Sequence, residues 1–306
     1  AFVGLAVAFM ALVVITYSCG FITKGSGTYF GYSLIALGAS LTAVFTNSLI
    51  LMIIAWDIVV VMLYLLVNTA DTDKAAAAAK KALIIIGVTD ALMIFGIGLV
   101  WARTGTFAID AIHIPLGDGL SYMAYFCIAI AAFAKAGALP LHSWLPDVAE
   151  DAPTPVGAYL PASLDKLLGI YLLTRASLGL FEMSKISNLV LLIVGSVTIL
   201  VAVMLALVQH NFKRLLGYHA ISQVGYMVLG IGTATPIGIA GALFHMLNNA
   251  LYKSCLFLTG GAVEKKAGSL DLGNLGGLAK YMPLTFIACL VAALSISGIP
   301  PFNGFF

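Results

Sequence analysis

Lysines stand inside apolar runs of this sequence, where a charged side chain needs a reason. Lys135 ends a run of small and apolar residues, and Pro140 follows five residues later. Lys166 stands at the same distance from a proline on its N-terminal side, Pro161. A charge at the centre of a membrane-spanning helix costs about 2.5–3.5 kcal/mol on insertion scales. Such lysines are therefore expected in an ion pathway, a proton relay or a structural ion pair.

Aspartates and a third lysine occur in similar surroundings. Asp57 lies within the apolar run LILMIIAWDIVVVMLYLLV, Asp90 within another, and Lys253 within a later one. Two simpler interpretations remain open. Asp57 could form only a structural ion pair with a neighbouring helix, and Lys135 could extend its ammonium group to the membrane surface. Five charges inside apolar runs nevertheless indicate a buried ionic pathway.

The backbone beyond Lys135 is expected to break. Pro140 lacks an N–H group and clashes with the preceding helical turn, and Gly137 loosens the same stretch. Carbonyl groups freed at membrane depth are tolerated only where protein or water satisfies them. A discontinuous helix beside a lysine is how transporters build ion sites. Lys135 is therefore the central candidate, and His142, just beyond the break, is a secondary one.

Asp165 directly precedes Lys166 in the sequence. Adjacent residues point in different directions on a helix, whereas residues three or four apart are neighbours. We therefore expect Asp165 to serve another helix rather than to neutralise Lys166.

Polar side chains recur at helical spacing in two later runs. Each set would lie on one face of an otherwise apolar helix, and such a face must turn toward protein partners or water. The simpler interpretation is hydrogen bonding between helices. The first stripe comprises His219, Ser222, Gln223 and Tyr226, and the second His245, Asn248, Asn249, Tyr252 and Lys253.

Proton or cation movement is the chemistry that these groups suit. Burial favours the neutral form of a lysine, and a nearby carboxylate favours the charged form. A lysine between these influences can switch its charge when the carboxylate moves. Histidine titrates near neutral pH and can relay protons between such sites.

Other chemistries find little support. Neither histidine of the stripes has a second histidine four residues on, and Asn249 takes that place after His245. The sequence contains no C-x-x-C pair, no Gly-x-Ser-x-Gly motif and no glycine-rich nucleotide loop. We therefore predict no metal, no disulfide scaffold and no cofactor. The cysteines, each alone in an apolar run, are Cys19, Cys127, Cys255 and Cys289.

The composition requires a membrane protein to position these residues. Hydrophobic residues make up 61% of the 306 residues and charged residues 9%, whereas about a quarter of a soluble domain is charged. The net charge of +2 gives no reason to expect nucleic acid. About twenty apolar residues span a bilayer. We predict an all-α, multi-pass protein with spans near 1–22, 29–46, 48–68, 79–101, 119–139, 155–176, 187–208, 213–233, 236–262 and 283–300.

Cations in the loops predict the orientation. If alternate loops share a side, the larger group is expected in the cytoplasm. Ala1 would then lie near the outer face of the cell (cytoplasmic) membrane. The larger group is Lys24, Lys74, Lys80, Lys81, Lys213, Arg214, Lys265, Lys266 and Lys280, and the smaller is Arg103, Arg175 and Lys185.

Long motifs cover nearly the whole chain from about Tyr29. They are KAGALPLHSWLPDVAEDAPTPVGAYLPASLDKLLGIYLLTR, WD at Trp56, FKRLLGYHAISQVGYMVLG, LFHMLNNALYKSCLFLTGGAV and GGLAKYMPLT…ISGIPPFNGFF. The chain resembles the antiporter-like membrane subunits of respiratory complex I, Mrp-type cation/proton antiporters and energy-converting membrane-bound hydrogenases. The form LPASLDKLLGIY is most similar to the hydrogenase-type branch.

The resemblance implies a fold of about fourteen helices with two inverted five-helix repeats. We expect a single transmembrane domain, 1–306, that is an internal segment of a longer protein. Residues 29–176 would form the first repeat and 187–306 a truncated second repeat. GALPLH and GIPPFN would be the broken helices of the two repeats.

The resemblance also implies roles for the buried charges. Lys135 corresponds to the central lysine, and Lys166 to the lysine that connects it onward. Asp57 stands where the family usually has a glutamate, the partner of the central lysine. Aspartate is one methylene shorter, so its distance from Lys135 is expected to differ.

The remaining positions correspond to a relay at the centre of the fold. His245 and Lys253 match this relay, while Asn249 replaces a histidine found in some members. Asp90 matches an acidic position that only some members have. The predicted path runs through Asp57, Lys135, Lys166, His245 and Lys253, with Asp90, His219, Asn249, Asp165 and His142 in secondary positions.

The function implied is that of a proton-translocating membrane subunit of a redox-driven complex, hydrogenase-type or complex I-like. The chain would be a non-redox subunit without a catalytic cofactor. Its partners would be other membrane subunits, a peripheral redox arm and the lipid bilayer. A Na⁺/H⁺ antiporter module of an Mrp-type complex is the first alternative. A structural membrane scaffold is the second, and a quinone-binding subunit finds little support.

Overall fold

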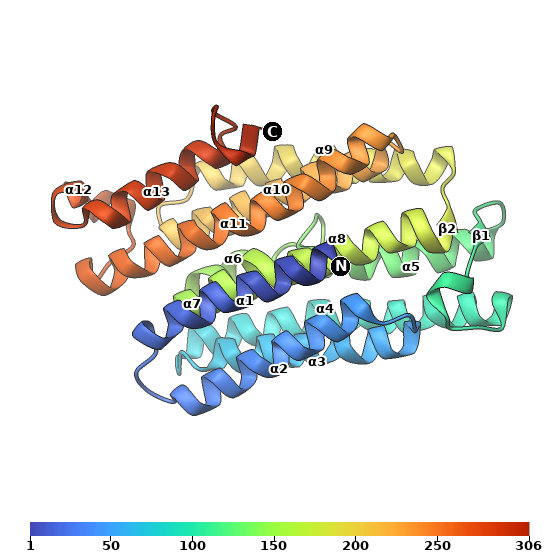
Figure 1. Ribbon diagram of the computed structural model, residues 1–306, viewed down its shortest axis with the longest axis horizontal. Helices are drawn as coiled ribbons and strands as arrows, with labels where there is room; N and C mark the ends of the chain where they lie inside the picture. The colour runs from blue at the N-terminus through green and yellow to red at the C-terminus, as the bar shows by residue number, and fades with distance from the viewer. Residues whose placement is uncertain (306) are drawn as a thin grey trace.

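In the computed structural model, which describes residues 1–305, the chain forms a bundle of helices that run side by side (Figure 1). Helices α9, α10, α11 and α13 gather on one side, α2, α3 and α4 on the other, and α1, α5 and α8 between them. The long helices are α1 (Phe2–Phe21), α2 (Ser26–Phe45), α3 (Leu49–Asn68), α4 (Asp73–Thr104), α5 (Gly119–Ala136), α8 (Asp165–Arg175), α9 (Lys185–Leu207), α10 (Phe212–Gly232), α11 (Pro236–Ala267) and α13 (Pro283–Ile296).

Short elements join the long helices. The helices α6 (Trp144–Asp151), α7 (Thr154–Tyr159) and α12 (Leu278–Tyr281) are accompanied by π-helical stretches at Leu160–Leu164 and Ala176–Leu180. Short 3₁₀ helices lie at Ile109–Ala111, Leu272–Asn274 and Asn303–Phe305. The strands β1 (Ile114–Pro115) and β2 (Phe181–Glu182) pair in parallel.

The predicted all-α architecture is confirmed, and each predicted span falls on a helix. Seven helical segments of the described chain are long and apolar enough to cross a membrane, including the continuous run Thr154–Leu180. Helices α10 and α11 are of comparable length but carry the polar stripes. The fourth span is longer than the predicted range 79–101: α4 has 32 residues and extends from Asp73 to Thr104.

The distribution of side chains is that of a membrane protein. Large apolar side chains lie on the outside: Leu5, Leu207 and Leu284 are 72%, 75% and 81% exposed. Charged side chains lie inside, where Lys135, Lys166 and Lys253 are at most 1% exposed. Lipid accepts the apolar exterior, and the interior must then satisfy the charges.

Alternate loops share an end of the bundle, which was the premise of the predicted orientation (Figure 1). Residues 22–25, 69–72, 208–211 and 268–277 lie at one end, which we call the lysine-rich end. Residues 46–48, 105–118, 181–184 and 233–235 lie at the opposite end. Bridges between loops hold each end together: Asn211 pairs with Asp271 at the first, and Ser48 with Ala108 at the second.

Two helices are followed by a break in the helical backbone. Helix α5 ends at Ala136, where Gly137 adopts a φ of +85°, and α6 begins only at Trp144. Helix α13 ends at Ile296, and Gly298 adopts a φ of +68°. Glycine takes such left-handed conformations without a steric penalty. The predicted break beyond Lys135 is therefore confirmed.

Candidate functional site

Lys135 lies at the centre of a cluster of charged side chains from four helices, α3, α4, α5 and α8. Its Nζ donates to the carbonyl oxygen of Trp56 on α3 at 3.1 Å and lies 4.4 Å from the centre of the same tryptophan's ring. The Oδ1 of Asp165 on α8 is 4.0 Å away. One carboxylate, one carbonyl oxygen and one aromatic face therefore surround the ammonium group. The side chains of Lys135 and Asp165 are both at most 1% exposed.

The prediction for Asp165 is confirmed, because it forms its ion pair with Lys135 and not with its neighbour Lys166. Neither carboxylate oxygen of Asp165 has a hydrogen-bond donor among the described residues. A buried carboxylate without hydrogen bonds is costly. The position therefore suits a group that gains and loses a proton or contacts water.

Asp57 does not take the predicted place directly beside Lys135. The close ion pair of Lys135 among the described residues is with Asp165, and Asp57 acts on its charge from farther away. The physical reason is helix geometry. Trp56 and Asp57 are adjacent on α3, and Trp56 occupies the side that faces Lys135.

Asp57 instead belongs to a carboxyl pair with Asp90 of α4. The two carboxyl groups are close enough to act on each other's charge, and both also act on the charge of Lys135. Asp90 also accepts a hydrogen bond from the indole Nε1 of Trp56 at 2.8 Å. Trp56 thus contacts Lys135 with its ring and carbonyl group, and the carboxyl pair with its N–H group.

The broken backbone beyond Lys135 is satisfied by its neighbours. The carbonyl oxygen of Ala134 accepts from the indole of Trp144 at 2.9 Å, and that of Ala136 accepts from Lys166 at 3.4 Å. The N–H group of Leu139 donates to Thr198 Oγ1 at 3.2 Å. The break therefore supplies a carbonyl ligand for Lys166.

His142 lies beyond the break and outside the cluster. Its Nδ1 is 3.3 Å from the carbonyl oxygen of Pro140. The structure thus brings together five of the predicted residues around Lys135 and leaves His142 apart. The five are Asp57, Asp90, Lys135, Asp165 and Lys166.

A π-helical stretch immediately precedes Asp165 and Lys166. Ser163 within it donates to the carbonyl oxygens of Ala158 and Tyr159, and Ser254 of α11 also donates to Ala158. Single π-helical turns inside α-helices are frequent at functional sites because they rotate the following residues. Pro161 was the visible signal of this irregularity in the sequence.

Lys253 lies in a different environment on α11. Its Nζ donates to the carbonyl oxygen of Leu216 on α10 at 3.3 Å, and its side chain is fully buried. No carboxylate among residues 1–305 lies within ion-pair distance of it, and the nearby charge of Lys166 repels it. Lys253 is therefore held mainly by neutral polar groups.

The two polar stripes supply further neutral groups on the same helices, α10 and α11. Buried atoms without a hydrogen-bond partner among the described residues are His219 Nδ1, His245 Nε2 and both amide atoms of Asn249. Their partners in a membrane interior would be ordered waters. His245 also lines a cavity of about 380 Å³, together with Gln223 and Tyr226.

Asn248 and Asn303 form a contact that the sequence reasoning missed. The amide of Asn248 donates to the carbonyl oxygen of Asn303 at 2.8 Å, and the amide of Asn303 donates back to Asn248 Oδ1 at 2.9 Å. The pair joins α11 to the chain after the second break. Trp56 was also missed as a site residue. The motif WD contains Trp56, and the motif GIPPFN contains Asn303.

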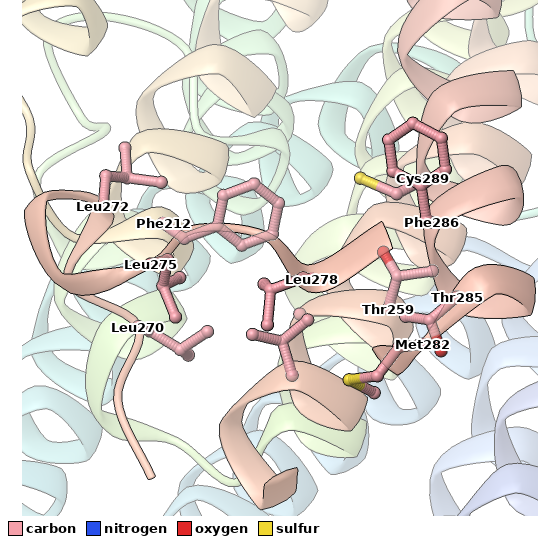
Figure 2. Close-up of a pocket in the computed structure, with 12 residues that line it drawn as sticks. Phe212, Thr259, Leu270, Leu272, Leu275, Leu278, Met282, Thr285, Phe286 and Cys289 are labelled. Carbon is pink, nitrogen blue, oxygen red and sulfur yellow. The ribbon is translucent and has the colours of Figure 1, made fainter. Parts of the chain in front are cut away.

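A separate cavity of about 220 Å³ lies between α11, α13 and the loop that joins them. Figure 2 shows that leucine, phenylalanine, methionine and threonine side chains line it. Its only titratable side chain among the lining residues is Cys289. This cavity is therefore unrelated to the charged cluster.

The described residues contain no group of three or more histidine, cysteine, aspartate or glutamate side chains that could hold a metal ion. The arrangement that remains is a chain of buried ionisable groups. It reaches from the Asp57–Asp90 pair through Lys135, Asp165 and Lys166 to Lys253.

Curated proteins are similar in sequence to this chain. A Na(+)/H(+) antiporter subunit of Alkalihalophilus pseudofirmus is 32% identical over 96% of this chain and 39% of its own length. NAD(P)H-quinone oxidoreductase subunit 5 of Chaetosphaeridium globosum chloroplasts is 34% identical over 97% of this chain and 47% of its own length. The chain thus spans less than half the length of these curated relatives.

Solved structures share the fold. The Mrp complex from Dietzia sp. has a chain that superposes with a TM-score of 0.91 at 31% identity, covering 99% of this chain and 34% of that one. The archaeal membrane-bound sulfane sulfur reductase gives 0.90 at 25% identity, covering 98% and 63%. Respiratory complex I from Thermus thermophilus gives 0.84 at 27% identity, covering 99% and 67%.

Residues 46–306 match the family described as NADH:quinone oxidoreductase/Mrp antiporter, TM. The match covers far more than half of the chain and includes every buried charge described above. The chain belongs to this family of antiporter-like membrane subunits.

Proposed function

We propose that this chain translocates protons through the membrane as part of a subunit of a multi-subunit complex. The observation that carries the proposal is the ion pair of Lys135 and Asp165, which is fully buried beside a broken helix. A scaffold would not need a buried carboxylate whose oxygens have no hydrogen-bond donor among residues 1–305. A proton relay does, because its groups must change protonation.

Each step of the proposed path has a neighbour within reach. Asp57 and Asp90 act on each other's charge, Trp56 contacts both Asp90 and Lys135, and Asp165 lies 4.0 Å from the ammonium group of Lys135. Lys166 follows on α8, and its charge acts on Lys253. His219 and His245 continue the path beyond Lys253 on the polar faces of α10 and α11.

The kind of complex is open between two candidates. The relatives include Na⁺/H⁺ antiporter subunits and quinone oxidoreductase subunits, and the structural neighbours include an Mrp complex and two respiratory complexes. A Mrp-type Na⁺/H⁺ antiporter module is at least as well supported as the redox-driven complex favoured by the form LPASLDKLLGIY. A hydrogenase-type or other peripheral redox arm belongs only to the second candidate.

The two-repeat organisation and the orientation are part of the proposal. Breaks after α5 and α13 at Gly-Pro-rich segments support repeats at 29–176 and 187–306. The lysine-rich end would face the cytoplasm under the positive-inside rule, with Ala1 near the outer face.

Lys135→Ala in the complete complex tests the proposal. We expect the complex to assemble and coupled proton transport by reconstituted proteoliposomes to be abolished. Lys185→Ala, which removes a cation from the surface at the opposite end, is the matched control and should transport normally. Wild-type transport by an assembled Lys135→Ala complex would contradict the relay, and loss of assembly would favour the scaffold.

Transport with and without a protonophore separates the two ions. If protons are the transported species, dissipating the proton gradient removes every signal except the leak. If Na⁺ is exchanged for protons, ²²Na⁺ uptake driven by a Na⁺ gradient builds a proton gradient that opposes further exchange. The protonophore collapses this proton gradient, so ²²Na⁺ uptake continues and becomes faster.

A further inference from the structure

A second group of charged residues lies at the lysine-rich end, outside the path proposed above. Lys213 on α10 has a side chain that is 6% exposed, and its Nζ donates to the carbonyl oxygen of Ala152 at 3.0 Å. The same Nζ is 3.7 Å from Oε1 of Glu264, and Thr154 Oγ1 donates to Oε2 at 2.7 Å. Glu264 is 39% exposed, so its carboxylate contacts water on one side and a buried ammonium group on the other.

Glu264 shares a helix face with Lys253. From Lys253, the positions of Phe257, Gly260, Gly261 and Glu264 on α11 follow i+4, i+7, i+8 and i+11. Such spacing places them on one face. Eleven residues correspond to about 16 Å of helix, so Glu264 lies about 16 Å along α11 from the buried Lys253.

Helix α7 runs along this face of α11. At one end, Thr154 contacts Glu264 and packs so closely on Gly261 that a Cβ there would lie 2.6 Å from its Cγ2. At the other end, the carbonyl oxygen of Ala158 accepts a hydrogen bond from Ser254, the neighbour of Lys253. Polar contacts therefore mark both ends of the α7–α11 interface.

The middle of this interface is apolar. Phe257 is 1% exposed, and a Cβ at Gly157 on α7 would lie 3.3 Å from its ring. An aromatic ring that packs on a glycine closes the space between the helices and excludes water. Phe257 thus separates the water-accessible carboxylate of Glu264 from the fully buried Lys253.

We propose that Glu264, with Lys213 and Thr154, is the site that takes up protons at the lysine-rich end, and that Phe257 is the gate between this site and Lys253. The proposal rests on the proposed function, since it gives the proton path a beginning at the water. Lys213 was counted among the loop cations of the sequence, and Glu264 was not singled out there.

The proton balance is simple. A proton from water binds the Glu264 carboxylate, and the neutral acid no longer attracts the ammonium group of Lys213. When the ring of Phe257 moves from Gly157, water enters the interface and carries the proton to the amine form of Lys253. Glu264 returns to the carboxylate, and its ion pair with Lys213 forms again.

Glu264→Gln in the complete complex tests the uptake site. The amide retains the size of the side chain and an acceptor for Thr154, but it does not take up a proton. We expect an assembled complex whose proton transport falls by about a hundredfold, the scale of a lost proton-transfer group. Glu264→Asp should recover part of the rate. Glu182→Gln removes an exposed, ion-paired carboxylate at the opposite end and should leave transport unchanged.

Lys253→Met, measured in parallel, separates the two proposals. Transport retained in Glu264→Gln but lost in Lys253→Met would overturn the uptake site and leave the pathway standing. Transport retained in both would overturn the pathway as well. A Glu264→Gln complex that fails to assemble, judged by co-purification of the partner subunits, would make this ion pair structural and overturn the uptake site.

Phe257→Ala tests the gate. Opening the interface should increase the passive proton leak of proteoliposomes held at a membrane potential, while Phe257→Leu, which keeps most of the apolar volume, should leak less. Combining Phe257→Ala with Glu264→Gln should suppress the extra leak if the two residues share one route. Equal, wild-type leak in both Phe257 variants would overturn the gate.

Discussion

Two of the fully buried lysines, Lys135 on α5 and Lys253 on α11, have different surroundings. Lys135 has a carboxylate at 4.0 Å, a carbonyl oxygen at 3.1 Å and an aromatic face. Lys253 has one carbonyl oxygen at 3.3 Å, with histidine and asparagine side chains nearby that lack hydrogen-bond partners within residues 1–305.

The difference indicates two ways of tolerating a lysine inside a membrane protein. An opposite charge stabilises the charged form of Lys135, so moving that charge can change its protonation. Around Lys253, neutral polar groups can accommodate either form with the help of water. The first site is suited to switching, and the second to relaying.

The largest effect on stability is expected from Asp165→Asn. The substitution leaves the ammonium group of Lys135 buried without its ion-pair partner, which typically costs about 3–5 kcal/mol. The measurement is the thermal unfolding of the purified complex. The double variant Asp165→Asn/Lys135→Met should recover stability without recovering transport. Equal stability of the single and double variants would show that the pair is not a charged one.

A smaller effect is expected from Trp56→Phe at the same site. Phenylalanine keeps an aromatic ring near Lys135 but removes the N–H group that donates to Asp90, and an unsatisfied buried acceptor costs about 1–3 kcal/mol. Trp101→Phe, at an exposed tryptophan stacked on Phe107, is the control and should change stability little. If both variants unfold alike, the indole hydrogen bond does not stabilise the cluster.

At the second lysine, Asn249→Leu should separate stability from transport. The amide of Asn249 makes no hydrogen bond with the described residues, so its removal should change the free energy of unfolding by less than about 1 kcal/mol. Proton transport should nevertheless slow, because the amide would no longer organise water beside Lys253. Unchanged transport would remove Asn249 from the relay.

The smallest effect on stability is expected at the exposed ion pair of Arg103 and Asp118, which is a surface comparison for the two buried lysine sites. Hydrogen bonds from Ser121 and Arg103 hold the pKa of Asp118 below its usual range. Its stabilising contribution is therefore present above the unfolded pKa, near 4, and is lost as pH falls through the lower folded value. The gap in unfolding temperature between wild type and Asp118→Asn should be small near neutral pH and close on acidification.

Salt distinguishes the exposed pair from the buried one. Added salt screens exposed charges, so it should narrow the difference in unfolding temperature between wild type and Asp118→Asn. It should leave the lower unfolding temperature of Asp165→Asn nearly unchanged. A difference in unfolding temperature between wild type and Asp118→Asn that widens on acidification would contradict the lowered pKa of Asp118.

Much of the fold follows from local sequence features. Apolar runs of membrane length predicted the helices, and Gly137 with Pro140 predicted the break beyond Lys135. The alternation of cation-rich loops predicted the two ends of the bundle. These features depend on chain stretches of about twenty residues or fewer, so no knowledge of distant contacts was needed.

Partners across helices were harder to predict. The position of Asp57 next to Trp56 indicated a carboxylate near Lys135, but the rotation of α3 decides which of the two adjacent residues faces it. Helix geometry alone predicted that Asp165 would serve another helix rather than neutralise Lys166. Its pairing with Lys135 depends on how α8 packs against α5, aided by a π-helical stretch that periodicity does not reveal.

The sequence by itself determined that the protein lies in a membrane, that it is helical, and that Lys135, Lys166 and Lys253 are buried, because the cost of a charge in lipid acts at each position separately. Only the tertiary structure decided which carboxylate holds Lys135, that Lys253 has none within residues 1–305, and that Glu264 and Lys213 meet. These outcomes depend on the rotation and packing of helices, where a turn of one residue exchanges one partner for another.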